Sequence, residues 1–179
     1  DVAAALATEG GVDAVAMDQV ADRAGVSRPL VYKHFANREE LLGALYRREA
    51  GRLHAELTAR VSSATDVEGM FRALVQGALA AAGERRHVLA VLRTGGWSRG
   101  VRDEQRERDS RTTQAFVAAV VAERGVDRRA AVGSGSLLLA LIDGVLGQWR
   151  VDPTPRRAAS LEASYMTVVR GTLRELADG

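Results

Sequence analysis

Cysteine is absent from this chain of 179 residues, so the sequence offers neither a disulfide framework nor a thiolate metal site. Histidine is scarce, and its three occurrences show no ligand spacing, so we expect no metal. The longest apolar stretch without a charge, residues 130–142, is shorter than the roughly 20 residues that cross a bilayer. No signal peptide is recognisable. We therefore expect a cytoplasmic protein that needs no cofactor and contacts no membrane.

Proline is also rare, with three residues, whereas alanine is abundant. Apolar residues recur at spacings of three and four, and no segment shows the alternation typical of a strand. A chain that is 46% hydrophobic and 27% charged fits one or two soluble domains. The sequence predicts an all-α fold of about nine helices, at residues 1–9, 17–24, 28–35, 38–61, 66–82, 85–94, 100–124, 128–150 and 155–177.

Lysine is nearly missing, since every basic residue except Lys33 is arginine. The formal net charge is only +2, and the first fifty residues carry six basic against eight acidic side chains. Bulk charge therefore does not indicate nucleic-acid binding, and any contact with DNA must come from a local cluster.

The first fifty residues contain three short predicted helices, which must share a core because helices of this length are unstable alone in water. Gly25 lies where a helix C-terminus favours a left-handed residue, and Ser27 is a good N-cap for the next helix. Two helices joined by a tight glycine turn predict a helix-turn-helix. The expected core residues are Val2, Leu6, Met17, Val20, Ala21, Ala24, Val26, Val31 and Phe35.

The segment DQVADRAGVSRPLVYKHFANREELL, residues 18–42, resembles the DNA-binding signature of the tetracycline-repressor (TetR) family of bacterial transcriptional regulators. The stretch AGVSRPLVYKHF is its most specific part, and the similarity covers residues 1 to about 48. The resemblance implies a homodimer with a DNA-binding domain at 1–48 and a ligand-binding and dimerisation domain at 49–179. It also implies that the last two helices form the dimer interface.

By this resemblance, helix 28–35 is the recognition helix that enters the major groove of double-stranded operator DNA. Arginine suits guanine O6 and N7, an apolar side chain suits a thymine methyl, and the remaining polar residues suit phosphates. The alternative for Tyr32 and His34 is packing within the small domain, and for Arg28 and Lys33 it is a solvated helix face. The predicted DNA-binding residues are Ser27, Arg28, Pro29, Leu30, Tyr32, Lys33 and His34.

The chain departs from the usual family pattern at two places. Ala16 stands where a small polar residue usually contacts a phosphate. Pro29 and Leu30 replace Gly and Thr, which removes a backbone N–H and turns a polar base reader into an apolar one. The operator of this chain therefore cannot be copied from those of relatives.

The fourth predicted helix begins with a capping box, in which Asn37 is the N-cap and Glu40 follows three residues later. Apolar residues then follow one side of the helix from Leu42 to Val61. We expect this long helix to transmit conformational change between the two domains.

The last two predicted helices show apolar surface beyond what one neighbour covers, which favours burial against a second subunit. Small residues on helix 128–150 allow close approach of another helix, and apolar residues recur along helix 155–177. The alternative is a single bundle core in a monomer. The predicted interface residues are Gly133, Ala140, Gly144, Leu161, Tyr165, Val168, Thr172 and Leu176.

Most large side chains of the C-terminal domain fall between the DNA-binding segment and this interface. The resemblance implies that they line a cavity for a small apolar effector, whereas an ordinary core is the alternative for each of them. Asp143 and His87 are the polar groups in this region, and each could instead make a helix-to-helix hydrogen bond. The predicted pocket residues are Met70, Phe71, Leu74, Trp97, Phe116, Val120, Leu141 and Asp143.

One catalytic motif is present by chance. Residues 96–100, GWSRG, fit the G-x-S-x-G nucleophile elbow, but that triad requires a histidine downstream of the serine and all three histidines lie upstream. We expect no catalytic residues and no enzyme. The sequence predicts a DNA-binding regulator, a repressor released from a palindromic operator by a small apolar effector. The alternative is a DNA-binding protein without such a ligand, controlled by a protein partner or architectural.

Overall fold

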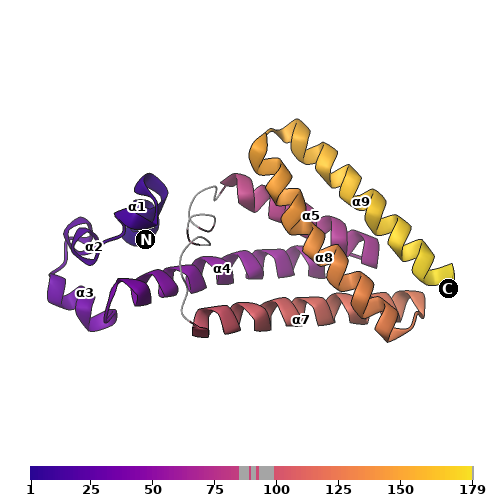
Figure 1. Ribbon diagram of the computed structural model, residues 1–179, viewed down its shortest axis with the longest axis horizontal. Coiled ribbons are helices and arrows are strands. Elements are labelled where there is room, and N and C mark those ends of the chain that lie inside the picture. Colours follow the sequence, from indigo (N-terminus) through magenta and orange to yellow (C-terminus); the bar gives the residue numbers. More distant parts are fainter. Residues whose placement is uncertain (85–88, 90–91, 93–98, 179) are drawn as a thin grey trace. The chain divides into compact units, whose positions relative to one another are not determined.

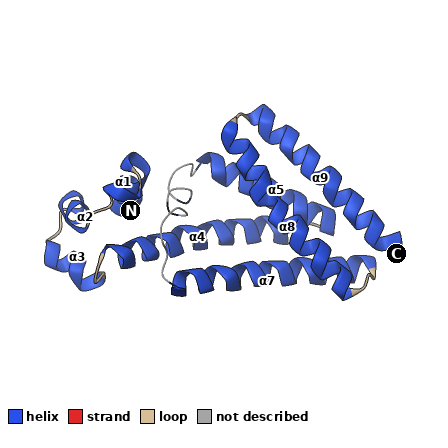
Figure 2. Cartoon of the chain, in the orientation of Figure 1, coloured by secondary structure: helices blue, strands red, loops and turns tan. Residues whose placement is uncertain are grey.

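Helices form the described part of the chain, which comprises residues 1–84, 89, 92 and 99–178 of a computed structural model (Figures 1 and 2). No strand occurs among these residues, which confirms the all-α prediction. The predicted helices agree with the observed ones to within one or two residues, except that helix 85–94 falls almost wholly outside the described residues. The elements are α1 (Val2–Gly10), the 3₁₀ helix η1 (Val12–Ala14), α2 (Met17–Ala24), α3 (Arg28–His34), α4 (Arg38–Ser62), α5 (Val67–Glu84), α7 (Arg99–Arg124), α8 (Arg128–Val151) and α9 (Pro155–Asp178).

Side-chain caps explain several helix starts. The Asp127 carboxylate accepts hydrogen bonds from the backbone N–H groups of Arg129 and Ala130 at the start of α8, over 2.8 and 3.0 Å. Asp66 caps α5 in the same way, through a 2.6 Å bond from the Gly69 N–H. These bonds satisfy N–H groups that have no partner within the helix, so the helices begin where the sequence provides an acceptor.

The first compact unit comprises Asp1–His54 with the described part of residues 85–105. Within it α1 packs on α2, and α2 packs on α3. The prediction that Ala24 and Val26 belong to this core is wrong: both residues are exposed, Val26 at 38%, because they lie at the turn around Gly25 and not on the packed faces of the helices. The buried apolar cluster consists of Leu6, Ala7, Val15, Met17, Val20, Ala21, Val31, Leu41, Leu42, Leu45, Tyr46 and Leu92.

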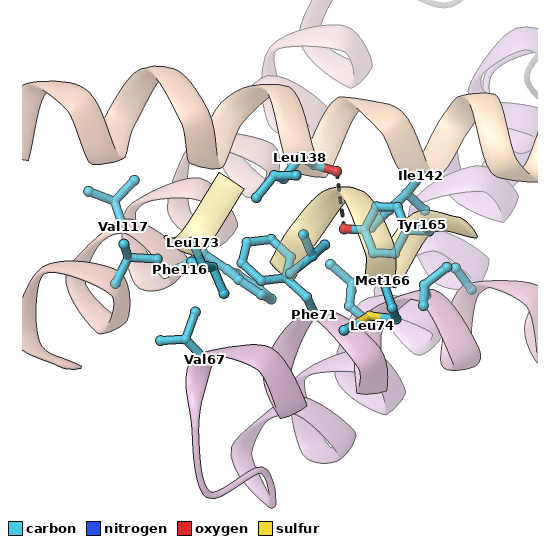
Figure 3. Close-up of a cluster of buried hydrophobic side chains, with 14 of the residues drawn as sticks. Val67, Phe71, Leu74, Phe116, Val117, Leu138, Ile142, Tyr165, Met166 and Leu173 are labelled. Atoms are coloured by element: carbon cyan, nitrogen blue, oxygen red, sulfur yellow. Dashed lines mark hydrogen bonds between the residues drawn. The ribbon is translucent and has the colours of Figure 1, made fainter. Parts of the chain in front are cut away.

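The second unit comprises Ala55–Glu84 and Arg106–Gly179, with α9 packed on α8 and α5. Figure 3 shows its core, where the rings of Phe71 and Phe116 lie 4.7 Å apart between centroids. Gly77 permits close approach of α5 to α4, since a Cβ there would lie 2.5 Å from Leu57 Cδ2. The unit boundary falls within α4, after His54, whereas the sequence placed it earlier on the same helix, after residue 48.

Among the described helices, α8 alone is long and apolar enough to cross a membrane by length and composition. We expected no membrane partner from the sequence, and one such helix is weak evidence for a span because core helices have the same composition. However, only 22% of the apolar segment of α8 is buried inside the chain. The outward face of α8 therefore remains apolar and uncovered by its own subunit.

Candidate nucleic-acid interface

The turn between α2 and α3 has the geometry that its sequence predicts. Gly25 is left-handed, with φ 67° and ψ 30°, and the Val26 N–H donates to the Ala21 carbonyl over 3.1 Å. This is the six-to-one hydrogen bond of a Schellman motif, which ends α2 and redirects the chain within two residues. A side chain at Gly25 would be strained in this conformation, so the tight turn depends on glycine.

The start of α3 differs in detail from the prediction. Ser27 occupies the N-cap position, but its side chain makes no capping hydrogen bond. Its backbone carbonyl accepts from the Leu30 N–H over 3.0 Å. Pro29 lies in the first turn, where a missing N–H removes no helical bond. The Ser27 hydroxyl is therefore not used to cap α3.

The faces of α3 divide sharply between core and solvent. Val31 is 6% exposed and packs in the core of the first unit, whereas Leu30 and Tyr32 are 42% and 51% exposed. The other predicted DNA-binding side chains, Arg28, Lys33 and His34, are exposed as well. Tyr32 and His34 thus lie on the solvent face and not inside the small domain. One surface brings together hydrogen-bond donors, an apolar side chain and positive charge, which are the groups that read and hold DNA.

Ion pairs explain why the first fifty residues, which carry more acidic than basic side chains, can still present a basic helix. Arg23 donates from its two terminal nitrogens to the Glu9 carboxylate over 2.5 and 2.6 Å, tying α2 to α1. The Arg23 hydrogen bond holds the pKa of Glu9 below its usual value. Arg28 Nη1 lies 3.2 Å from Asp18 Oδ2. These pairs offset acidic charge locally, which the charge count of the sequence alone does not show.

Arg38, at the start of α4, is a residue whose role the sequence analysis missed. Its guanidinium donates to the backbone carbonyls of Val12 and Val15, over 2.6 and 2.7 Å. Nothing in the local pattern indicates these acceptors, because they lie more than twenty residues earlier in the chain. Half of the predicted capping box beside it is present: the Glu40 N–H donates to Asn37 Oδ1 over 2.9 Å, but the Glu40 carboxylate accepts from the Ala36 N–H over 2.7 Å and not from the N-cap Asn37. The two Arg38 hydrogen bonds fix the start of α4 to the segment before α2.

The residues predicted to line an effector pocket occupy several different environments. Phe71, Leu74, Phe116 and Val120 are buried in the core of the second unit, and Met70 is partly buried against it. Two predicted pocket residues lie elsewhere, since Leu141 is 44% exposed and Asp143 is also exposed on α8. Trp97 and His87 lie outside the described residues. An open groove of about 510 Å³ at the junction of α4 and α5 contains none of these side chains; its lining includes Arg60, Asp66, Glu68, Arg72 and Gln76.

Among the predicted interface residues, Tyr165 requires a correction. It is 3% exposed, and its hydroxyl donates to the Leu138 carbonyl over 3.1 Å, so it belongs to the core of its own subunit (Figure 3). Burial raises the pKa of Tyr165 above its usual range. The others lie at or near the surface: Gly133, Ala140, Gly144 and Val168 are exposed, and Leu161, Thr172 and Leu176 are partly buried.

No group of three His, Asp or Glu residues in the described part of the chain is arranged to hold a metal ion. The residues that meet at the exposed face of α3 instead offer non-covalent contacts. This face is accordingly the candidate functional site.

Comparison with known proteins identifies this region. Residues 1–45 match the sequence profile described as "Bacterial regulatory proteins, tetR family". A segment of 66 residues, 37% of this chain, is 38% identical to the HTH-type transcriptional activator FasR of Mycolicibacterium smegmatis. That segment spans 30% of FasR.

Solved structures extend the likeness of the fold over nearly the whole chain. The TetR family transcriptional regulator PfmR of Thermus thermophilus aligns over 94% of this chain and 95% of its own, with TM-score 0.70 and 21% identity. The transcriptional regulator FadR of Bacillus subtilis, solved in complex with stearoyl-CoA, aligns over 94% of both chains with TM-score 0.72 and 15% identity. Residues 1–45 are thus similar to bacterial regulatory proteins of the tetR family, and the fold of nearly the whole chain is like that of PfmR.

Proposed function

We propose that this protein regulates transcription by binding a near-palindromic operator as a homodimer, with α3 in the major groove. The exposed face of α3 carries this proposal: Val31 anchors the helix in the core while Arg28, Leu30, Tyr32 and Lys33 face solvent. Guanidinium and apolar groups provide base contacts, and Lys33 provides a phosphate contact. The match of residues 1–45 to the tetR family profile supports a DNA-binding regulator and not an enzyme.

The uncovered surface of α8 supports the dimer. Leu137 is 69% exposed, and Gly133, Ala140, Leu141 and Gly144 lie on the same side of the helix, opposite the buried residues Ala131, Leu138 and Ile142. Val168 of the adjoining helix α9 is 47% exposed. A second copy of the chain would cover this face through a twofold axis. Two recognition helices would then read half-sites about 34–36 Å apart, one turn of DNA.

The direct test selects bound fragments of the source genome with the purified protein and measures their affinity. We expect a short, near-palindromic sequence that binds at least about 10³-fold more tightly than random duplex at the same salt concentration. A stable, folded protein that enriches no common sequence would contradict the proposal. A reporter driven by the selected promoter then distinguishes repression, which we propose, from activation, the role named for FasR.

For the effector we propose a small apolar molecule that weakens operator binding from within the second unit. The FadR structure with stearoyl-CoA favours, as the first class to test, molecules with a long acyl chain. The aromatic pair of Phe71 and Phe116 lies in an apolar core formed by α5, α7, α8 and α9, so an acyl chain that enters there must separate packed side chains. Binding would thereby couple to helix movement, because a ligand shifts an equilibrium by its differential affinity for two conformations.

The effector test measures thermal stability and operator release with acyl-CoA thioesters of increasing chain length, and with free coenzyme A as the control. A rise in Tm together with operator release by the long-chain thioesters would support this class. If neither these compounds nor a broad panel of apolar metabolites has an effect, control by a protein partner becomes the better interpretation.

A further inference from the structure

An acidic side chain lies beside the first residue of the recognition helix. Asp18 is in the first turn of α2, and its Oδ2 is 3.2 Å from Nη1 of Arg28, the first residue of α3. Both side chains are half-exposed, at 49% and 59%. The ion pair therefore connects the two helices of the motif at the surface proposed to face DNA.

A carboxylate at this place is unfavourable for DNA binding in general. It repels phosphates, and an exposed ion pair adds little to folding stability. Asp18 does have a favourable position relative to the dipole of α2, whose N-cap, Ala16, provides no side-chain hydrogen bond. That local role does not require Arg28 as a partner, so the pairing calls for a separate reason.

The form of the contact indicates that reason. The Arg23–Glu9 pair engages both terminal nitrogens and ties two helices together, as a structural pair does. In the described part of the chain, Arg28 is held through one terminal nitrogen, so its remaining N–H donors face outward. Fixing one side of the guanidinium fork limits its rotation while leaving donors for a base edge, which reduces the entropy lost when the base is bound.

We propose that Asp18 is a positioning residue that orients Arg28 toward one operator base pair and so determines specificity. This role rests on the proposed function. Asp18 acts in two ways: it favours the guanidinium orientation that reads the correct base, and its charge disfavours binding to DNA where no such base is present. It thus raises discrimination between sequences and lowers non-specific affinity.

The test compares Asp18→Asn, Arg28→Ala and the double variant in the full-length protein. Affinities are measured for the selected operator, for operators with each single base pair replaced, and for random duplex. Glu9→Gln is the charge-matched control, because it removes one carboxylate from the same unit and leaves the Asp18–Arg28 pair intact. Asp18→Glu keeps the charge, and Tm is recorded for every variant.

We expect Asp18→Asn to reduce discrimination by about two- to five-fold, the range that corresponds to an exposed ion pair, at the same base pair that Arg28→Ala affects. The double variant should lose no more discrimination there than Arg28→Ala alone, and Asp18→Glu should restore part of it. Non-specific affinity should rise in Asp18→Asn. Glu9→Gln should leave the pattern of discrimination along the operator unchanged, even if total affinity rises.

Unchanged discrimination in Asp18→Asn would overturn this role, as would losses in the double variant that add up independently. A lower Tm with wild-type discrimination would show that Asp18 only stabilises α2, which overturns it too. If Arg28→Ala itself keeps full discrimination, the inference fails while the proposed function stands. If the wild-type protein selects no operator, the proposed function fails, and this role fails with it.

Discussion

The guanidinium of Arg38 and the carbonyl of Val15 are joined by a 2.7 Å hydrogen bond from Nε, and a second bond reaches the Val12 carbonyl. Arg38 begins α4, and the two acceptors are the first residue of η1 and the residue that follows η1, so one side chain holds the start of the long helix to the segment before α2. The helix itself continues from the first unit into the second.

Replacing Arg38 with Met should destabilise the first unit. The variant removes two charge-assisted hydrogen bonds to partly buried carbonyls, and we expect a loss of about 1–2 kcal/mol in the free energy of unfolding, since the side chain is partly solvated. Urea unfolding monitored by circular dichroism measures this loss. Arg38→Lys keeps the charge without the planar fork, so its free energy of unfolding should lie between those of the wild-type protein and Arg38→Met. Wild-type stability in Arg38→Met would contradict a clamping role.

The two basic residues of α3 should differ in how they affect operator binding. Arg28→Ala should lower affinity by about 1–3 kcal/mol for the correct operator and relax specificity at one position, because it removes a base contact. Lys33→Ala should weaken all DNA sequences alike and reduce the slope of log K against log salt by about one, because it removes a phosphate contact. Titrations at several salt concentrations separate these effects, and identical behaviour of the two variants would refute the assignment.

A charge on the outward face of α8 or α9 should separate the proposed dimer. Leu137→Glu and Val168→Glu place a carboxylate in an apolar interface, and we expect monomers that bind the operator weakly. Thr167→Glu is the matched control, because this exposed residue neighbours Val168 but points to a different side of α9. Light scattering at micromolar concentration measures the mass. A monomeric wild-type protein, or dimers in both variants, would argue against this interface.

Tyr165 should make stability sensitive to alkaline pH. Burial raises its pKa in the folded protein, so the unfolded chain loses the phenolic proton first as pH rises above about 10, and stability falls there. Below that pH the buried Tyr165 hydroxyl contributes fully to the free energy of unfolding. Tyr165→Phe removes one hydrogen bond, and we expect a loss of about 1 kcal/mol near neutral pH but a shallower decline at alkaline pH. Parallel declines in the two proteins would show that other groups cause the alkaline effect.

The effector prediction is best tested with a mild change in the core. Phe71→Ala would remove a fully buried ring at a cost of about 3–5 kcal/mol, which endangers folding. Phe71→Leu keeps most of the volume and should alter the response to a long-chain ligand while leaving ligand-free operator binding nearly unchanged. Linkage requires that operator DNA lower effector affinity by the same factor by which effector lowers operator affinity. A wild-type ligand response in Phe71→Leu would argue against effector binding beside this ring.

Local chemistry in the sequence determined the helix boundaries and the turn. The left-handed conformation at position 25 favours glycine over residues with a side chain. Asn37 caps the start of α4 by accepting a hydrogen bond from the Glu40 N–H, as the spacing predicts. These features involve residues only a few positions apart, whose geometry is set by the backbone itself. The family resemblance rested on the same segment, and for that reason it could be recognised without a structure.

Tertiary packing decided which side chains are covered, and here the sequence was insufficient. Tyr165 and Val168 belong to one apolar stripe of α9, yet Tyr165 is buried against α8 and Val168 faces solvent. The carbonyl acceptors of Arg38 and the pairing of Asp18 with Arg28 likewise depend on where separate helices meet. Helical spacing defines a face, but the crossing of neighbouring helices selects the part of that face that is buried, and that choice involves residues far apart in the chain.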